Sequence, residues 1–144
     1  MATKFLTPQE QDRVVKAIES AELDTSGEIR VHIESSCSGD PLERAVYIFE
    51  KIGMHLTSRR NGVLIYIAFK SHKLAIIGDE GINSKVADDF WQEEIKLLTD
   101  YLRKGEAADG LTAVIEAVGN NLKDIFPYKE GDVNEQSNEI SFGE

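Results

Sequence analysis

The residues that could do chemistry gather in two short polar segments that flank a predicted β-hairpin. Residues 59–62 precede one apolar run, and residues 79–83 follow the next apolar run along the chain. The loop that enters one strand of an antiparallel pair lies beside the loop that leaves its partner strand. We therefore expect the two segments to form one candidate ligand-binding site. Its predicted members are Arg60, Asn61, Gly62, Asp79 and Glu80.

Oxygen-bearing side chains in the second segment suggest a site for a hard cation. Asp79, Glu80 and Asn83 offer carboxylate and amide oxygens, which suit Ca²⁺ or Mg²⁺. The chain has no Asp-x-Asp-x-Asp-Gly calcium loop. In the alternative interpretation, Asp79-Glu80-Gly81 forms a turn, and Asn83 or Ser84 caps the following helix. The metal site is therefore a hypothesis, and the turn is the favoured alternative.

Arg60 and Asp79 are also candidate catalytic residues for chemistry on a phosphoryl ester. A guanidinium can hold phosphate through two hydrogen bonds, and a carboxylate can act as nucleophile or base. The chain has no Cys-x5-Arg loop, no Asp-x-Asp nucleophile motif and no P-loop. Without such a motif, the residues favour a solvated loop pair at Arg59 and Arg60. No catalytic residue is assigned on this basis.

Cysteine and histidine offer little further chemistry. Cys37 is the single cysteine, so an internal disulfide and a multi-cysteine metal site are excluded. A reactive thiol needs a lowered pKa, and an inert, half-buried Cys37 is the favoured interpretation. The three histidines are scattered, and the His-Glu-x-x-His spacing of zinc proteases is absent.

Length and charge narrow the function further. The chain has 144 residues, and 26 acidic against 16 basic side chains give a formal charge of −10. One domain with a sizeable core is the default at this length. The charge argues against general binding of nucleic acid and against docking on anionic lipid. We expect no signal peptide and no membrane insertion, because the longest apolar run covers only residues 63–69. The predicted location is cytoplasmic.

Helical spacing predicts helices before, between and after the strands that position the site. Two helices begin where a capping residue precedes a proline, at Thr7 and at Asp40. Helical spacing returns after Gly81, with a break near Asp88, and again over residues 107–126.

Three strands follow from apolar periodicity. Alternation over residues 29–33 predicts a strand with one wet or polar face. Continuous apolar runs over residues 63–69 and 74–78 predict more deeply buried strands. The first two strands form a parallel strand–helix–strand unit, and the short connection makes the last two an antiparallel hairpin. The predicted fold class is α/β: a three-layer α/β/α sandwich with a small mixed sheet and C-terminal helices.

The C-terminal residues differ in character from the rest of the chain. We predict an α/β domain over residues 1–128 and an acidic, flexible tail over residues 129–144. The tail contains one lysine and five acidic residues. Ile140 and Phe142 are apolar at a spacing of two. Two alternatives stay open: a disordered solubilising end, or a strip that adds a strand to a partner or to the protein's own sheet edge.

Several segments resemble the TPM-domain family, named after a thylakoid lumen protein, a photosystem-repair protein and an acetylcholine-receptor auxiliary protein. The sequence RNGVLIYIA at residues 60–68, followed by KLAIIG at residues 73–78, resembles the hairpin of that family. SGEIRV at 26–31 resembles its first strand, DFW at 89–91 the helix after the hairpin, and GEAADGL at 105–111 the entry to its last helix. The pieces occur in order at the right spacing over residues 7–126. The tail resembles that of a shorter bacterial branch without signal peptide or membrane helix.

The resemblance implies an α/β/α sandwich and two classes of function. Acid phosphatase activity and calcium binding are attributed to plant members of the family. Bacterial members often occur beside LemA-type membrane proteins, so such a protein is a possible partner. The leading functional hypothesis is a non-catalytic interaction or accessory protein that acts with a protein partner. The alternative is a metal-dependent acid phosphatase of low activity.

Two departures from the family bear on an inherited calcium site. Family members usually carry an acidic residue directly before the Asn-Gly that opens the hairpin, and this chain has Arg60 there. Many relatives read Gly-Tyr-Gly-Leu-Glu-Gly after the hairpin, where this chain has Gly78-Asp79-Glu80-Gly81-Ile82. The lost carboxylate weakens such a site, and the gained Asp79 could move it.

Overall fold

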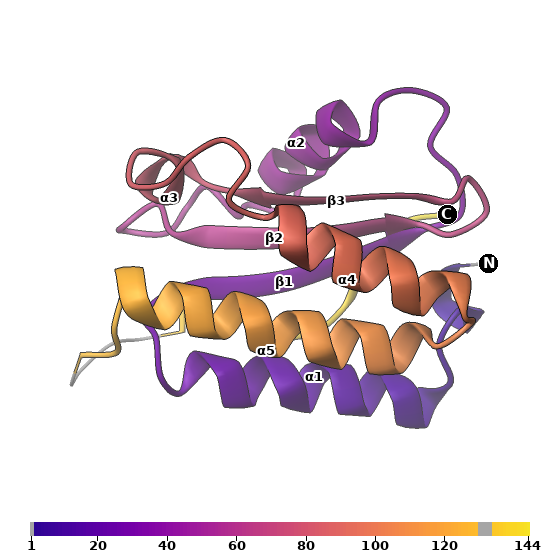
Figure 1. Cartoon of the computed structure of the whole chain (residues 1–144), viewed down its shortest axis with the longest axis horizontal. Coiled ribbons are helices and arrows are strands. Elements are labelled where there is room, and N and C mark those ends of the chain that lie inside the picture. The colour runs from indigo at the N-terminus through magenta and orange to yellow at the C-terminus, as the bar shows by residue number, and fades with distance from the viewer. Residues whose placement is uncertain (1, 130–133) are drawn as a thin grey trace.

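A four-stranded mixed sheet forms the middle layer of the computed structural model, which describes residues 2–129 and 134–144 (Figure 1). Its strands are β1 (Glu28–Glu34), β2 (Gly62–Ala68), β3 (Lys73–Gly78) and β4 (Ser141–Phe142). Their order across the sheet is β3-β2-β1-β4. β1 runs parallel to β2 and to β4, whereas β2 and β3 are antiparallel. The predicted parallel unit and hairpin are both confirmed.

Helices cover both faces of the sheet (Figure 1). α2 (Pro41–Lys51) lies on one face, and α1 (Pro8–Glu22), α4 (Gln92–Arg103) and α5 (Ala107–Ile125) lie on the other. This arrangement confirms the three-layer α/β/α sandwich. Within the two described ranges, no helix has the length and apolar character that crossing a bilayer requires.

Two short helical turns complete the chain. A 3-10 turn covers Ala2–Lys4, and α3 covers Glu80–Asn83 directly after β3. Residues 84–91 then form turns and bends before α4 begins. The predicted break in this helical region is therefore confirmed, and it is wider than the sequence pattern indicated.

Each face of the sheet has its own apolar core, because helices cover both. β2 is buried along its whole length. Its Val63, Ile65 and Ile67 side chains belong to the core under α1, α4 and α5. Leu64 and Tyr66 belong to the smaller core under α2. The continuous apolar run in the sequence reflects this burial on two sides.

The two helices that begin with a capping residue and a proline form as predicted. The Glu10 backbone N–H donates to the Thr7 hydroxyl at 3.1 Å, and the Thr7 N–H donates to the Glu10 carboxylate at 2.9 Å. At the second helix, the Asp40 carboxylate accepts from the Leu42 N–H at 2.9 Å. These bonds satisfy backbone donors that a helix start otherwise leaves without partners.

The polar face of β1 is buried rather than wet. Glu28, His32 and Glu34 each expose 3% of their surface. They lie on the same side of the sheet as α2, and β4 pairs alongside this strand. The alternation in the sequence identified the polar face correctly, but it contained no information on what covers that face.

The C-terminal segment packs against the sheet. Gly143 N–H donates to the Ile33 carbonyl at 2.8 Å, and Ser35 N–H donates to the Glu144 carbonyl at 2.7 Å. Ile140 is 9% exposed. These contacts correspond to the second alternative for the tail, a strand added to the protein's own sheet edge. Residues 130–133 of the predicted tail lie outside the described residues.

Candidate functional site

The predicted site lies where the hairpin opens. Val63 near the start of β2 pairs with Gly78 at the end of β3. The Asp79 N–H then donates to the Gly62 carbonyl at 2.9 Å. The loop before β2 and the turn after β3 are thereby held side by side, as the short hairpin connection predicts.

Arg60, Asp79 and Glu80 converge into one ion-pair cluster. The Arg60 Nε lies 2.8 Å from Asp79 Oδ2, and its Nη2 lies 2.9 Å from Asp79 Oδ1. Its Nη1 lies 3.1 Å from a carboxylate oxygen of Glu80. The hydrogen bond to Asp79 raises the pKa of the Arg60 guanidinium, which stays charged. The arrangement is the two-pronged geometry that arginine forms with carboxylates.

The internal pairing restricts what this cluster can bind. Asp79 is 6% exposed, and its Oδ1 also accepts the Glu80 N–H at 2.8 Å, which caps α3. A phosphate group or a cation would have to compete with bonds already formed within the chain. The Asn83 amide donates to the Gly78 carbonyl at 3.0 Å. Among the described residues, no group of three or more His, Cys, Asp or Glu side chains could hold a metal ion.

Asn61 and Gly62 hold the loop before β2 against neighbouring parts of the chain. Asn61 is 1% exposed, and its amide donates to the Ser26 carbonyl at 3.2 Å, so it ties the loop to the segment before β1. A Cβ on Gly62 would lie 3.0 Å from Met54 Cε. Gly62 contacts the Arg60 cluster through its backbone carbonyl, which accepts the Asp79 N–H, and the Asn61 side chain bonds to Ser26 instead.

A second polar cluster, which no sequence motif predicted, lies between the sheet and α2. Glu34 accepts two hydrogen bonds from Arg44, at 2.8 Å and 2.9 Å, and a third from the Tyr66 hydroxyl. Burial raises the pKa of Glu34, but the bonds from Arg44 and Tyr66 outweigh burial, so its pKa lies below the ordinary value. The buried carboxylate is therefore ionised and fully paired.

His32 lies beside this cluster under the C-terminal strand. Its Nδ1 lies 2.8 Å from the Ser141 hydroxyl, and its Nε2 lies 3.6 Å from Glu34 without a hydrogen-bond partner. Burial lowers the pKa of His32, so the ring is neutral at pH 7. A Cβ on Gly143 would lie 2.7 Å from Glu34 Oε1, so this glycine lets the tail backbone cover both side chains. Polar residues alternating along β1 were the only sequence sign of the cluster.

A comparison with family models now identifies the chain. The model of the TPM domain matches residues 2–121. The chain belongs to the TPM-domain family. The family resemblance predicted from the hairpin and its flanking segments is thereby confirmed.

Two solved structures show how far this TPM domain resembles its relatives. It is 42% identical to the BA42 protein from the psychrophilic bacterium Bizionia argentinensis, with a TM-score of 0.90 over 96% of each chain. It is 16% identical to the N-terminal domain of cg2496 from Corynebacterium glutamicum, with a TM-score of 0.66 over 92% of this chain and 82% of that one. The second likeness shows a shared fold alone. No curated protein matches.

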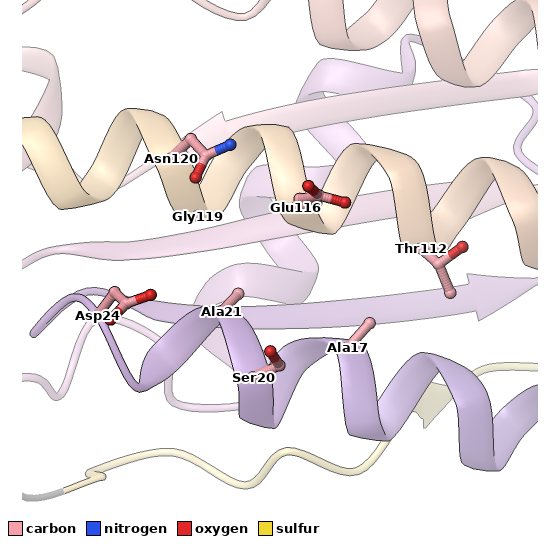
Figure 2. Close-up of a pocket in the computed structure, with 8 residues that line it drawn as sticks. All are labelled: Ala17, Ser20, Ala21, Asp24, Thr112, Glu116, Gly119 and Asn120. Atoms are coloured by element: carbon pink, nitrogen blue, oxygen red, sulfur yellow. The ribbon is translucent and has the colours of Figure 1, made fainter.

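One groove of the TPM domain lies on its helical surface. Figure 2 shows the groove between α1 and α5, where Ala21 faces Gly119. A Cβ on Gly119 would lie 2.8 Å from the Ala21 Cβ, so the two helices approach closely at this point. Ser20, Glu116 and Asn120 line the groove, which has a volume of about 440 Å³. The groove follows from close helix packing between small residues and holds no predicted site residue.

The remaining candidate of the TPM domain, Cys37, is buried. It is 7% exposed, and its thiol donates to the Gly39 carbonyl at 3.5 Å. The Lys73 ammonium also donates to the carbonyls of Cys37 and Gly39, at 3.0 Å and 2.7 Å. These hydrogen bonds fix the loop after β1 around the cysteine, which indicates a structural role for Cys37.

Proposed function

We propose that this TPM domain is a non-catalytic interaction domain that binds an extended segment of a partner protein along β3. β3 lies at the edge of the sheet, and among the described residues it pairs with β2 alone. An edge strand leaves a row of backbone donors and acceptors open on its outer side. An added strand from a partner is an established way in which proteins recognise extended peptides.

An apolar groove beside this edge is the observation that most supports the proposal. Leu42 and Val46 of α2 form one wall, and they are 53% and 51% exposed. Phe90 and Trp91 line the groove as well, together with Ile76 of β3. The groove has a volume of about 300 Å³. Exposed apolar side chains beside an open strand edge are typical of an interaction site.

The charge near the groove favours a basic partner. Asp88 lines the groove, and the whole chain has a formal charge of −10. The middle of β3, Leu74 to Ile77, contains none of the charged or proline residues that usually protect an edge strand. We therefore expect a partner segment with alternating apolar residues and flanking lysine or arginine.

A LemA-type membrane protein is the partner that we propose, on the basis of the family resemblance. We place the TPM domain in the cytoplasm, where it would meet the water-soluble part of such a protein. Calorimetry with that purified part and the full chain tests the interaction. We expect saturable binding that Val46→Asp and Leu42→Asp each weaken by about tenfold or more, because each places a charge on the apolar wall.

A matched control distinguishes specific binding in this groove from non-specific hydrophobic binding. Leu23 is 72% exposed at the end of α1. Leu23→Asp makes the same kind of change away from the groove and should leave the affinity unchanged. Equal weakening by all three variants would reject the groove, and no binding by the unmodified chain would reject this partner.

A metal-dependent acid phosphatase of low activity is the second candidate function. The convergence of Arg60 with Asp79 and Glu80 supports it, because a phosphate group that displaced the carboxylates from Arg60 would free their oxygens for Ca²⁺ or Mg²⁺. Hydrolysis of p-nitrophenyl phosphate with and without these cations is the test. Activity that requires the cation and is lost in both Asp79→Asn and Glu80→Gln, with folding intact, would favour the enzyme.

A further inference from the structure

We infer that a cavity under the hairpin, between β2, β3 and α4, binds a small amphipathic anion with an apolar body and one carboxylate. The cavity has a volume of about 600 Å³, which falls in the range of small-molecule sites, about 300–1,000 Å³. It involves none of the residues that form the Arg60 cluster or the groove along β3. A ligand in this cavity would therefore bind independently of the proposed protein partner.

Half-buried apolar side chains form the body of the cavity. Phe5 and Phe69 stack with their ring centroids 4.6 Å apart and nearly parallel. Leu74 and Leu102 line the cavity from β3 and α4. All four are partly exposed at the edge of the main core. An apolar ligand placed here would remove surface from water on both sides of the contact.

The lining of this apolar cavity includes two cationic side chains, Arg103 and Lys73, and the polar ring of His72. Arg103, at the end of α4, and His72, in the hairpin turn, both line it and are exposed. Lys73 lines it too, with its ammonium held by two carbonyl groups. Within the part of the chain that the structure describes, no carboxylate lines the cavity. In a chain of charge −10, such a lining selects an anionic head group over a cationic one.

The position of the cavity in the fold also favours a ligand. Ile67 lies near the carboxyl end of β2, and Phe69 follows that strand. Phe69 N–H donates to the Glu34 carbonyl at 3.1 Å, where the neighbouring parallel strand β1 ends. Open α/β sheets bind ligands beyond the carboxyl ends of their parallel strands. The cavity therefore lies where such sheets bind ligands, and its lining combines apolar side chains with two cationic ones.

The experiment is an NMR titration of the ¹⁵N-labelled full chain with octanoate, octanol, octylamine and butanoate. We expect saturable shifts with octanoate at the backbone of Phe5, Phe69, Leu74 and Leu102. Octanol should bind about tenfold more weakly because it has no charge for Arg103, and octylamine should not saturate. Butanoate should bind more than tenfold more weakly, because its apolar body is shorter.

Arg103→Gln and Lys104→Gln form a matched pair of variants. Both remove one positive charge from an exposed position at the end of α4, and only Arg103 lines the cavity. Arg103→Gln should weaken octanoate to the affinity of octanol, and Lys104→Gln should leave it unchanged. The inference is overturned by shifts outside the cavity, by octanol that binds as tightly as octanoate, or by equal effects of the two variants. None of these outcomes depends on whether a partner protein binds along the outer edge of β3.

Discussion

At the scale of single residues, buried carboxylates limit stability at neutral pH. Burial raises the pKa of Glu22 to about 8 and the pKa of Glu28 to about 7, from an ordinary value of 4.5. Between pH 4.5 and the raised pKa of each group, the folded state binds more protons than the unfolded state. The free energy of unfolding therefore falls as the pH rises through this window.

Glu22→Gln should raise the melting temperature at pH 8 by a few degrees. The change removes the cost of a buried charge, while the new amide oxygen can still accept the Ile29 N–H that Glu22 accepts at 2.8 Å. At about pH 4, where both states are largely protonated, the effect should vanish. Thermal unfolding over this pH range is the measurement. Glu19→Gln, at an exposed position, is the control, and an equal rise in that variant would contradict the burial argument.

Gly81, in α3, packs closely against the backbone of the loop that carries Arg60. A Cβ there would lie 2.3 Å from the Arg59 carbonyl oxygen and 2.5 Å from that of Arg60. Gly81→Ala should therefore lower the free energy of unfolding by about 2 kcal/mol or more, because the backbone must shift. Gly39→Ala is the control, because no atom lies within 4 Å of its added Cβ. Denaturant unfolding measures both, and similar values would refute the close contact.

At the scale of elements, the C-terminal strand contributes to stability. Ile140→Ala should lower the free energy of unfolding by about 2 kcal/mol, because the side chain is buried with the main core. Glu139→Ala, at an exposed position in the same segment, should have almost no effect. Calorimetric melting curves of the two variants measure the difference in stability. A tail that is disordered in solution would leave the two variants alike.

Short-range relations between elements could be predicted from the sequence, and long-range ones could not. The hairpin turn fixes its own register, so the proximity of Arg60 to Asp79 followed from the chain itself. The Glu34 cluster depends on how the helix after β1 crosses the sheet, and Tyr66 lies 32 residues further on. β4 has two residues, which is too short for a periodic pattern to indicate its partner. The exposure of Leu42 and Val46 also depends on packing that no local pattern shows.

At the scale of the whole molecule, the net charge opposes folding. A formal charge of −10 on a small domain produces self-repulsion that is stronger when the chain is compact. Added NaCl screens this repulsion beyond about 10 Å at 0.1 M. The partly buried pairs of Arg60 with Asp79 and of Arg44 with Glu34 are screened much less.

The melting temperature should therefore rise by a few degrees between roughly 10 mM and 300 mM NaCl. Thermal unfolding at fixed pH is the measurement. Potassium glutamate at the same ionic strength serves as a control for effects specific to chloride. A fall in melting temperature with salt would mean that attractive ion pairs outweigh the net repulsion.

The pairing of β4 with β1 has a consequence for synthesis of the protein. His32 and Ser141, which face each other in this pair, are separated by 109 residues. During translation the outer edge of β1 therefore stays open until Ser141 and Phe142 have left the ribosome. A chain interrupted before Ser141 would have an open strand edge on each side of its sheet and would leave Glu34 and His32 uncovered. Unpaired strand edges make such a product prone to aggregation and to capture by chaperones, so the pairing of β4 with β1 protects the sheet as well as the two side chains beneath it.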